Sequence, residues 1–199
     1  LVDLSDPAER LVGDYELLQM IGQGGMGIVY RARQRSLDRT VAVKLLAGSN
    51  LGSEFVARFR SEAQSAARMQ HPNIVTIHEI GATPRFSYFS MQLVDGESMA
   101  ERLAREGALP PREAALAMRT LAEAVEYAHE LNILHLDLKP ANVLVEKGGR
   151  LYIADFGLAR PLDQALASEN DEISGTPSYM APEQIQIREH RLSRATDLY

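Results

Sequence analysis

The apolar residues of this chain change their spacing at Gly96, and this change limits the folds that the chain can adopt. Before Gly96, short runs of β-branched and aromatic residues alternate with polar ones, a pattern typical of half-buried strands. There are five such runs: YELLQMI, IVYRAR and TVAVKLL between residues 15 and 46, VTIHEI at 75–80 and FSYFSMQL at 86–93. After Gly96 the apolar residues follow helical spacing, as in Ala114, Met118, Leu121, Val125 and Ala128. We therefore expect an α+β fold, with a five-stranded antiparallel sheet preceding a mainly helical part.

Local signals refine this division. Residues 1–14 are polar and aperiodic, with Pro7 and Gly13 as breakers, and predict an irregular leader. Ser53 can cap a helix that runs to about Met69. We expect one lobe over residues 15–94, with that helix as its only one, and the first part of a second lobe over residues 95–199.

Two helices and two strands are expected in the second lobe. Ser98 and Glu101 form a capping box, in which each side chain satisfies a backbone N–H, and Gly107 predicts the end of that helix. Pro110 and Pro111 open a longer helix that runs to about Leu131. Short strands are predicted at 143–145 and 151–154, on either side of a Gly-Gly turn.

Composition excludes several functions. The 21 Lys and Arg residues and 27 Asp and Glu residues give a net charge of −6, whereas nucleic-acid binding needs a basic surface. The chain has no cysteine, which excludes disulfides, thiolate zinc sites and cysteine nucleophiles. No apolar run approaches the roughly 20 residues of a membrane helix, and the acidic start does not resemble a signal peptide. Because the chain begins at Leu1 without Met and stops at Tyr199, we expect a fragment of a longer protein.

A glycine-rich segment at residues 22–27 matches the pattern G-x-G-x-x-G. Glycines allow backbone N–H groups to approach phosphate oxygens closely. The dinucleotide-binding version of this pattern needs a helix directly afterwards, but Ile28 and Val29 predict a strand. On the pattern alone, a phosphate-binding loop and a plain hairpin turn both remain possible.

Two charged residues follow the glycines. Lys44 lies on the third predicted strand and can reach phosphates held beneath the glycine segment. Glu62, on the predicted helix, can pair with Lys44 and fix it. The alternative is that both are solvated surface charges, since an exposed ion pair contributes little to stability.

The most specific segment is His-Leu-Asp-Leu-Lys-Pro-Ala-Asn at residues 135–142, followed by Asp-Phe-Gly at 155–157. Carboxylate and amide oxygens are hard ligands of the kind that Mg²⁺ favours, with phosphates and water completing its shell. A further acid and Lys139 supply a proton acceptor and a compensating positive charge.

The order of these motifs, ending in Ala181-Pro182-Glu183, resembles the protein kinase family from about residue 15 to residue 199. The segments GQGGMGIVY, HPNIV and GTPSYMAPEQ are similar to those of the bacterial, eukaryotic-like (Hanks-type) serine/threonine kinases. The resemblance implies a two-lobed protein-kinase-like fold, MgATP as phosphoryl donor and the Ser/Thr hydroxyls of a protein as acceptors. It also implies a cytoplasmic kinase domain that binds no nucleic acid, with any membrane anchor outside this chain.

The resemblance assigns roles residue by residue. Asp137 would accept or orient the substrate proton, Lys139 would neutralise charge on the transferred group, and Thr176 would lie beside the substrate hydroxyl. Asn142 and Asp155 would hold Mg²⁺. The nucleotide-binding set consists of Ile21, Gly22, Gly24, Gly27, Val29, Ala42, Lys44, Glu62, Met91, Gln92, Val94 and Leu144. His135 and Asp197 would instead be structural, with His135 stacked on Phe156 and Asp197 holding the catalytic loop.

The sequence departs from the family at Leu136, where the usual arginine binds a phosphate on the activation loop. Leucine cannot make that charge-assisted contact. We therefore expect activity not to depend on phosphorylation of Ser168 or Ser174 through this route.

The later helices of the large lobe are absent from the sequence, so we also expect that this piece alone can lack activity. The alternatives are a catalytically inactive nucleotide-binding scaffold and, far behind it, a dinucleotide oxidoreductase.

Overall fold

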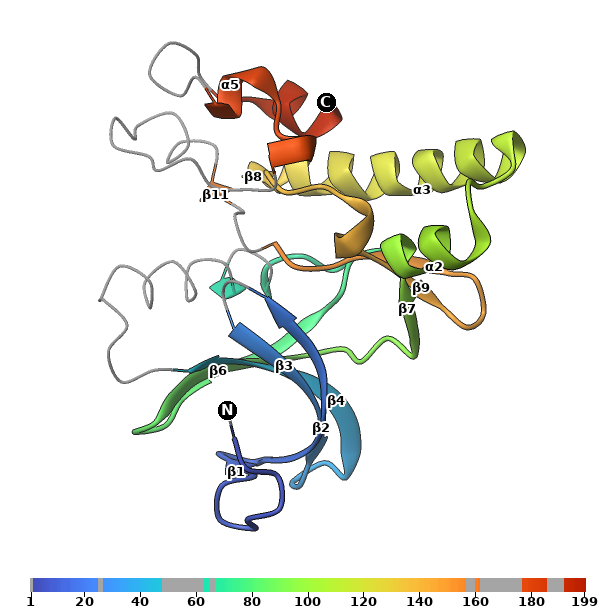
Figure 1. Cartoon of the computed structure of the whole chain (residues 1–199). Coiled ribbons are helices and arrows are strands. Elements are labelled where there is room, and N and C mark those ends of the chain that lie inside the picture. The colour runs from blue at the N-terminus through green and yellow to red at the C-terminus, as the bar shows by residue number, and fades with distance from the viewer. Residues whose placement is uncertain are drawn as a thin grey trace. The chain divides into compact units, whose positions relative to one another are not determined.

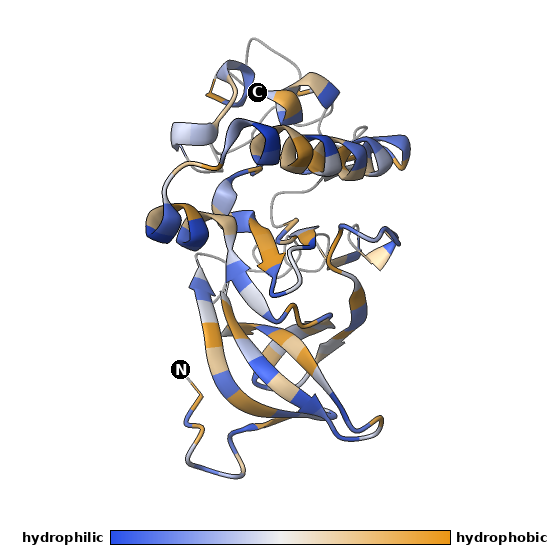
Figure 2. Ribbon diagram, turned by 90° about the vertical axis from the view of Figure 1, so that its right-hand side faces the viewer, coloured by the Kyte–Doolittle hydropathy of each residue, from blue (hydrophilic) through white to orange (hydrophobic). Residues whose placement is uncertain are grey.

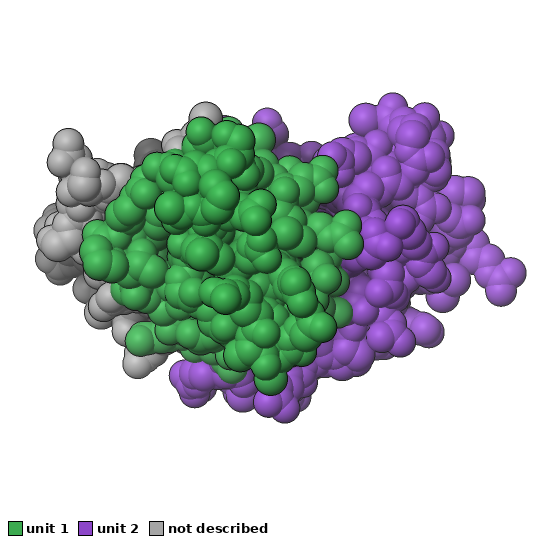
Figure 3. Space-filling model, turned by 90° about the horizontal axis from the view of Figure 1, so that it is seen from below, with its two compact units in different colours: residues 1–67, 76–93 green, residues 68–75, 94–199 purple. Residues whose placement is uncertain are grey.

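The computed structural model describes residues 2–24, 27–47, 63–64, 67–156, 160–161, 177–185 and 192–199 (Figure 1). The chain divides into two compact units, coloured separately in Figure 3. Unit 1 comprises Leu1–Ala67 and Thr76–Leu93, and unit 2 comprises Arg68–Val75 and Val94–Tyr199. These units differ from the predicted lobes in three ways: the predicted leader belongs to unit 1, and both residues 68–75 and Val94 belong to unit 2.

Unit 1 contains one antiparallel sheet with the strand order β1-β2-β3-β4-β6-β5. Its strands are β1 (Leu11–Val12), β2 (Tyr15–Gly24), β3 (Gly27–Gln34), β4 (Arg39–Ala47), β5 (Ile77–Ala82) and β6 (Phe86–Met91). Five of them are the predicted strands, although β5 begins two residues later than expected. The sixth, β1, lies within the segment that was predicted to be irregular, where Val12 pairs with Tyr15.

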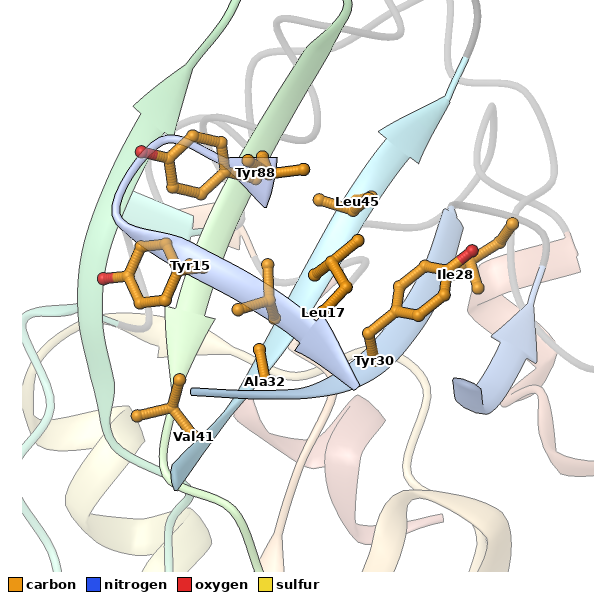
Figure 4. Close-up of a cluster of buried hydrophobic side chains, with 10 residues drawn as sticks. Tyr15, Leu17, Ile28, Tyr30, Ala32, Val41, Leu45 and Tyr88 are labelled. Atoms are coloured by element: carbon orange, nitrogen blue, oxygen red, sulfur yellow. The ribbon is translucent and has the colours of Figure 1, made fainter. Parts of the chain in front are cut away.

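One face of this sheet carries the apolar core of unit 1. Apolar and polar residues alternate along the strands (Figure 2), so that one set of side chains faces the core. On β4 this set is Val41, Val43 and Leu45, each no more than 1% exposed. Figure 4 shows Val41 and Leu45 with the tyrosines of the same cluster, of which Tyr15 and Tyr88 meet edge to face with their ring centroids 5.7 Å apart. The leader adds to this core, because Val12 is 1% exposed and Val2 and Leu4 pack against the cluster.

Unit 2 contains three α-helices, of which α5 is a single turn, three 3-10 turns and two small sheets among its described residues. The helical segments are α2 (Met99–Glu106), α3 (Pro111–Glu130), η1 (Pro140–Asn142), η2 (Pro177–Tyr179), α5 (Pro182–Ile185) and η3 (Arg194–Leu198). Strands β7 (Gly96–Ser98), β9 (Val143–Glu146) and β10 (Leu151–Ile153) form one antiparallel sheet, and β8 (Ile133–Leu134) pairs with β11 (Arg160–Pro161). In the part of the chain that the structure describes, no helix has both the length and the apolar character needed to span a bilayer.

The two helices predicted in unit 2 are confirmed. Ser98 caps α2 in the expected capping box with Glu101, and Gly107 ends the helix. On α3, Val125 and Ala128 are buried as predicted. The expected stripe is wrong at Met118, which is 64% exposed. The neighbouring Ala117 instead packs, with Leu121, against the cluster of Met99, Val143, Val145 and Leu151. The helix predicted from Ser53 to Met69 falls mostly outside the described residues.

Residues 68–75 are bound to the rest of unit 2 by backbone and side-chain hydrogen bonds. The Asn73 side chain donates from Nδ2 to the Leu151 carbonyl at 2.8 Å. Ile153 N donates to the Asn73 carbonyl at 2.8 Å, and Val75 N donates to the Ile153 carbonyl at 2.9 Å. The His71 ring also packs on the Tyr127 ring at 5.2 Å. These contacts explain why a segment lying between two parts of unit 1 in the sequence belongs to unit 2.

Candidate active site

In unit 1, the glycine segment forms the hairpin between β2 and β3. Gly22 pairs with Val29 and Gly24 with Gly27, while residues 25 and 26 lie outside the described residues. Gly27 has φ +145°, and a Cβ there would collide with the Leu45 carbonyl oxygen, so the hairpin itself requires this glycine. At Gly24, by contrast, a Cβ would meet no described atom within 4 Å. The fold does not require Gly24, and this leaves close approach of a ligand as a reason for it.

Lys44 lies in register with this hairpin. Val29 pairs with Lys44 on one side and with Gly22 on the other, and Lys44 pairs with Phe89 of β6. Lys44 is only 5% exposed, and its Nζ lies 5.7 Å from the Phe89 ring centroid. It alternates with Val43 and Leu45, so it points to the sheet face opposite the apolar core. The alternative of a solvated surface charge is therefore wrong for Lys44.

Unit 1 also contains other predicted nucleotide-binding residues. Ala42 is 3% exposed and pairs with Met91, two residues along β4 from Lys44 and therefore on the same face. Gln92 N donates to the Thr76 carbonyl at 2.8 Å. Ile21 is 46% exposed on β2. Glu62 lies outside the described residues, so its pairing with Lys44 stays a prediction.

In unit 2, the loop from His135 to Asn142 brings three predicted residues together. Lys139 Nζ lies 2.7 Å from Asp137 Oδ2. Asn142 Nδ2 donates to the Asp137 carbonyl at 2.8 Å and to Asp137 Oδ2 at 3.0 Å. The Asp137 carboxylate is thus oriented by a cation and an amide, and its side chain is 15% exposed. A carboxylate held in this way can accept a proton from a bound hydroxyl group.

Asp155 is brought beside this loop by the backbone. Ala154 N donates to the Asn142 carbonyl at 2.9 Å, so Asp155 directly follows a residue bonded to Asn142. Asp155 itself has φ +58°, a left-handed conformation that is uncommon for residues other than glycine. Within the described residues, no three His, Asp or Glu side chains form a metal-binding group. The predicted ligands, the Asp155 carboxylate and the Asn142 amide oxygen, are hard oxygens of the kind that fit Mg²⁺.

His135 supports the loop from inside. It is 1% exposed, its Nε2 lies 3.2 Å from the Ala154 carbonyl oxygen, and its ring lies 4.5 Å from the Phe156 ring. The predicted contact with Phe156 is therefore confirmed. Burial lowers the pKa of His135 because it disfavours the charged imidazolium.

Asp197 of η3 holds the backbone of the same loop. Its Oδ2 accepts from His135 N at 2.8 Å and its Oδ1 from Leu136 N at 2.7 Å, while His129 Nε2 lies 2.8 Å from Oδ2. Burial alone would raise the pKa of this carboxyl, but the hydrogen bonds outweigh burial and lower the pKa. The structural role predicted for Asp197 is confirmed.

Residues 15–199 match the protein kinase domain family. The chain belongs to the protein kinase family. It is 37% identical to the serine/threonine-protein kinase PrkC of Bacillus subtilis over 96% of this chain and 29% of the relative. It is also 37% identical to PknA of Mycobacterium tuberculosis, over 95% of this chain and 45% of the relative. A probable PknB of Bifidobacterium longum is 36% identical over 98% of this chain and 30% of the relative. The chain thus spans less than half the length of these bacterial kinases.

Two further residues of the predicted nucleotide-binding set lie in unit 2. Val94 is half-buried ahead of β7, and Leu144 lies on β9 between Ser98 and Tyr152. Thr176, Gly157, Ser168 and Ser174 lie outside the described residues, and their roles stay predictions. The family roles of the described site residues also stay predictions.

Three residues that bind the loop or its neighbours are not among the residues predicted from the sequence. His129 lies four residues after Val125 on the buried face of α3. Gln184 donates to the Leu136 carbonyl, and Thr196 donates to Glu183 Oε1 at 2.9 Å. Helical spacing could have found His129. The sequence holds no local signal for the other two contacts, because their partners are distant in the chain.

Proposed function

We propose that this chain is the catalytic domain of a serine/threonine protein kinase, which transfers the γ-phosphoryl group of ATP to protein hydroxyls with Mg²⁺. The observation that carries the proposal is the orientation of Asp137 by Lys139 and Asn142, in a loop anchored on Asp197. The names of the relatives support serine or threonine as acceptor. We place this domain in the cytoplasm, where ATP is available.

The residues of unit 2 suit the transfer step. The substrate hydroxyl oxygen forms a bond to the γ-phosphorus as the bond to the β–γ bridging oxygen breaks and ADP leaves. Asp137 accepts the hydroxyl proton, and Lys139 offsets negative charge on the transferred group. Bound Mg²⁺ would neutralise phosphate charge, with Asn142 and Asp155 as its protein ligands.

The residues of unit 1 suit nucleotide binding. Lys44 is a buried cation in register with the hairpin, and a buried cation is stabilised by an anionic partner such as a phosphate. The open space at Gly24 would let phosphate oxygens approach the backbone. Val29, Ala42 and Met91 would contribute apolar contacts to the purine.

Regulation through the activation loop is proposed to differ from that of kinases with an arginine at position 136. Leu136 is 7% exposed and packs with Leu134 and Leu192, so an apolar contact occupies this position. A variant with both Ser168 and Ser174 changed to Ala should keep its transfer rate. Loss of activity in that variant would show that this proposal is wrong.

The test is transfer of labelled γ-phosphate from MgATP to a basic protein and to the chain itself, measured with the full-length protein. Asp137→Asn should lower kcat by about 10²-fold or more, because the amide cannot accept the proton. Asp95→Asn is the matched control, since Asp95 is 73% exposed and pairs only with surface Lys147 in the described residues. A folded wild-type protein that binds ATP but transfers nothing would favour the scaffold function instead.

A further inference from the structure

Gln184 connects the short helix α5 to the catalytic loop. It is 6% exposed, and its Nε2 donates to the Leu136 carbonyl at 2.8 Å. Its Oε1 accepts from Ala181 N at 3.0 Å. One partner is a backbone acceptor and the other a backbone donor, so the orientation of the amide is unambiguous. The buried Gln184 side chain therefore uses both ends of its amide in hydrogen bonds. It joins α5 to Leu136, which lies 48 residues earlier in the sequence.

The acceptor of this bridge lies in a strained part of the loop. Leu136 has φ +64°, a left-handed conformation that is strained for a residue other than glycine unless its surroundings hold it. Asp197 holds its N–H and Gln184 holds its carbonyl, so Leu136 is fixed from both ends. The side chain packs with Leu134 and Leu192.

The carbonyl of Leu136 belongs to the peptide group whose nitrogen is that of Asp137. This peptide plane is held at its oxygen by Gln184 and at its N–H by His135 Nδ1, at 3.2 Å. Fixing this plane fixes the position of the Asp137 Cα. The Asp137 carbonyl accepts from Asn142 Nδ2 at 2.8 Å, which restrains the remaining rotation about N–Cα, so the two contacts together set the direction of the Asp137 side chain. Without Gln184, the plane would lose the 2.8 Å bond at its oxygen and would keep the longer bond, 3.2 Å, from Asp137 N to His135 Nδ1.

We propose that Gln184 is a positioning residue for phosphoryl transfer: it sets the Leu136–Asp137 peptide plane and thereby aims the Asp137 carboxylate. This inference rests on the proposed kinase function. Gln184 lies in α5, directly after Glu183, so the bridge also makes the catalytic loop sensitive to the conformation of the segment around residues 181–185.

The bridge can be tested with two substitutions of Gln184. Gln184→Leu removes both bonds at similar volume. Gln184→Glu keeps the shape, but an ionised carboxylate cannot donate to the Leu136 carbonyl, whereas a protonated carboxyl can. Because burial raises the pKa of a carboxyl, the Glu variant should regain the donor as the pH falls from about 8 to about 6. The acidic groups linked to the same network, Glu183 and Asp197, are present in every variant, so rates are divided by the wild-type rate at each pH.

The primary measurement is steady-state phosphate transfer by the full-length protein, with kcat and the KM for ATP determined separately. Gln184→Leu should lower kcat by about 10–100-fold at unchanged KM for ATP, because misplacing a catalytic group by about 1 Å can cost 10²-fold. Gln184→Glu should show the same loss at high pH and recover toward the wild-type rate at low pH. The control Ile185→Glu adds a carboxylate at a neighbouring position that is 53% exposed, and its relative rate should not change with pH.

A second measurement does not depend on turnover. Amide hydrogen exchange at Asp137, whose N–H belongs to the peptide held by Gln184, should speed up in Gln184→Leu and in Gln184→Glu at high pH relative to wild type. If Gln184→Leu does not fold, the exchange rate at Asp137 can be compared within Gln184→Glu alone, between high pH, where the donor is absent, and low pH, where it is present.

Four outcomes separate the possibilities. Wild-type kcat in Gln184→Leu, or equal losses in Gln184→Leu and Gln184→Glu at every pH, would overturn the positioning role. Unchanged exchange at Asp137 in both variants would overturn it as well. If the wild-type protein transfers no phosphate but the exchange changes are found, the proposed function fails while the control of this peptide by Gln184 stands.

Discussion

Replacing Asp197 by asparagine would remove one acceptor oxygen from a carboxylate that receives three hydrogen bonds. Oδ2 accepts from His135 N and contacts His129, and Oδ1 accepts from Leu136 N. If the amide oxygen takes the position of Oδ2, the NH₂ group faces the Leu136 N–H. If it takes the position of Oδ1, the NH₂ group faces the His135 N–H. Either way, one backbone donor loses its acceptor.

The size of the effect follows from this geometry. A buried donor without a partner costs about 1–3 kcal/mol, and hydrogen bonds to a charged acceptor contribute about 1 kcal/mol more than neutral ones. The Asp197 side chain is 1% exposed, so water does not replace the lost acceptor. We expect Asp197→Asn to lower the free energy of unfolding by about 3 kcal/mol. For a chain of this size that corresponds to a fall in Tm of about 6–12 °C.

The assay is thermal and urea unfolding of the full-length protein beside Asp95→Asn, which removes the same charge at an exposed position and should change stability by less than about 0.5 kcal/mol. The pKa of Asp197 in the folded chain is below its ordinary value of 3.8, so its stabilisation is fully present above pH 3.8 and is lost as the pH falls through the folded pKa. The stability difference between wild type and Asp197→Asn should therefore narrow in acid. Equal melting of the two at neutral pH would refute the hydrogen-bond argument.

Three smaller changes test other parts of the structure. Gly24→Ala should leave the free energy of unfolding within about 0.5 kcal/mol of wild type, because a Cβ there meets no described atom within 4 Å. It should nevertheless raise the KM for ATP, and an unchanged KM would show that this glycine is not part of the nucleotide site. Tyr30→Phe should be neutral or stabilising by up to about 1 kcal/mol in urea unfolding, because its buried hydroxyl has no hydrogen-bond partner among the described residues; a clear loss would contradict this. Ser98→Ala should cost about 1 kcal/mol by removing the α2 cap, whereas Ser98→Asp, which can also cap, should cost less.

Sequence patterns predicted the elements that obey a local rule. The strands of unit 1 alternate, and α2 has a complete capping box, so their positions followed from residue spacing. Strand β7 was missed because Gly-Glu-Ser carries no such pattern. It forms through its pairing with β9, where a Cβ on Gly96 would collide with the Val145 carbonyl oxygen. Such a close approach becomes visible only when both strands are in place.

In the candidate site, too, contacts within one loop could be predicted from the sequence, whereas contacts between distant segments could not. Asp137, Lys139 and Asn142 lie within six residues, and their contacts follow from one loop. The contacts that fix this loop come from far away in the sequence, since His129 and Asp197 are 68 residues apart and Leu136 and Gln184 are 48 apart. The residues next to each of these four in the sequence carry no signal for the distant partner, so only the packed structure reveals which residues meet.

The first twelve residues show that the limit of a family match and the limit of a folding unit need not coincide. The match begins at Tyr15, but Val12 is buried in the same cluster as Tyr15, and Arg85 pairs with Glu9. A truncation designed from the family match alone would cut through this cluster and expose apolar area on an otherwise complete sheet. Natural variation in this segment would then alter the abundance and solubility of the domain while every catalytic residue stayed the same.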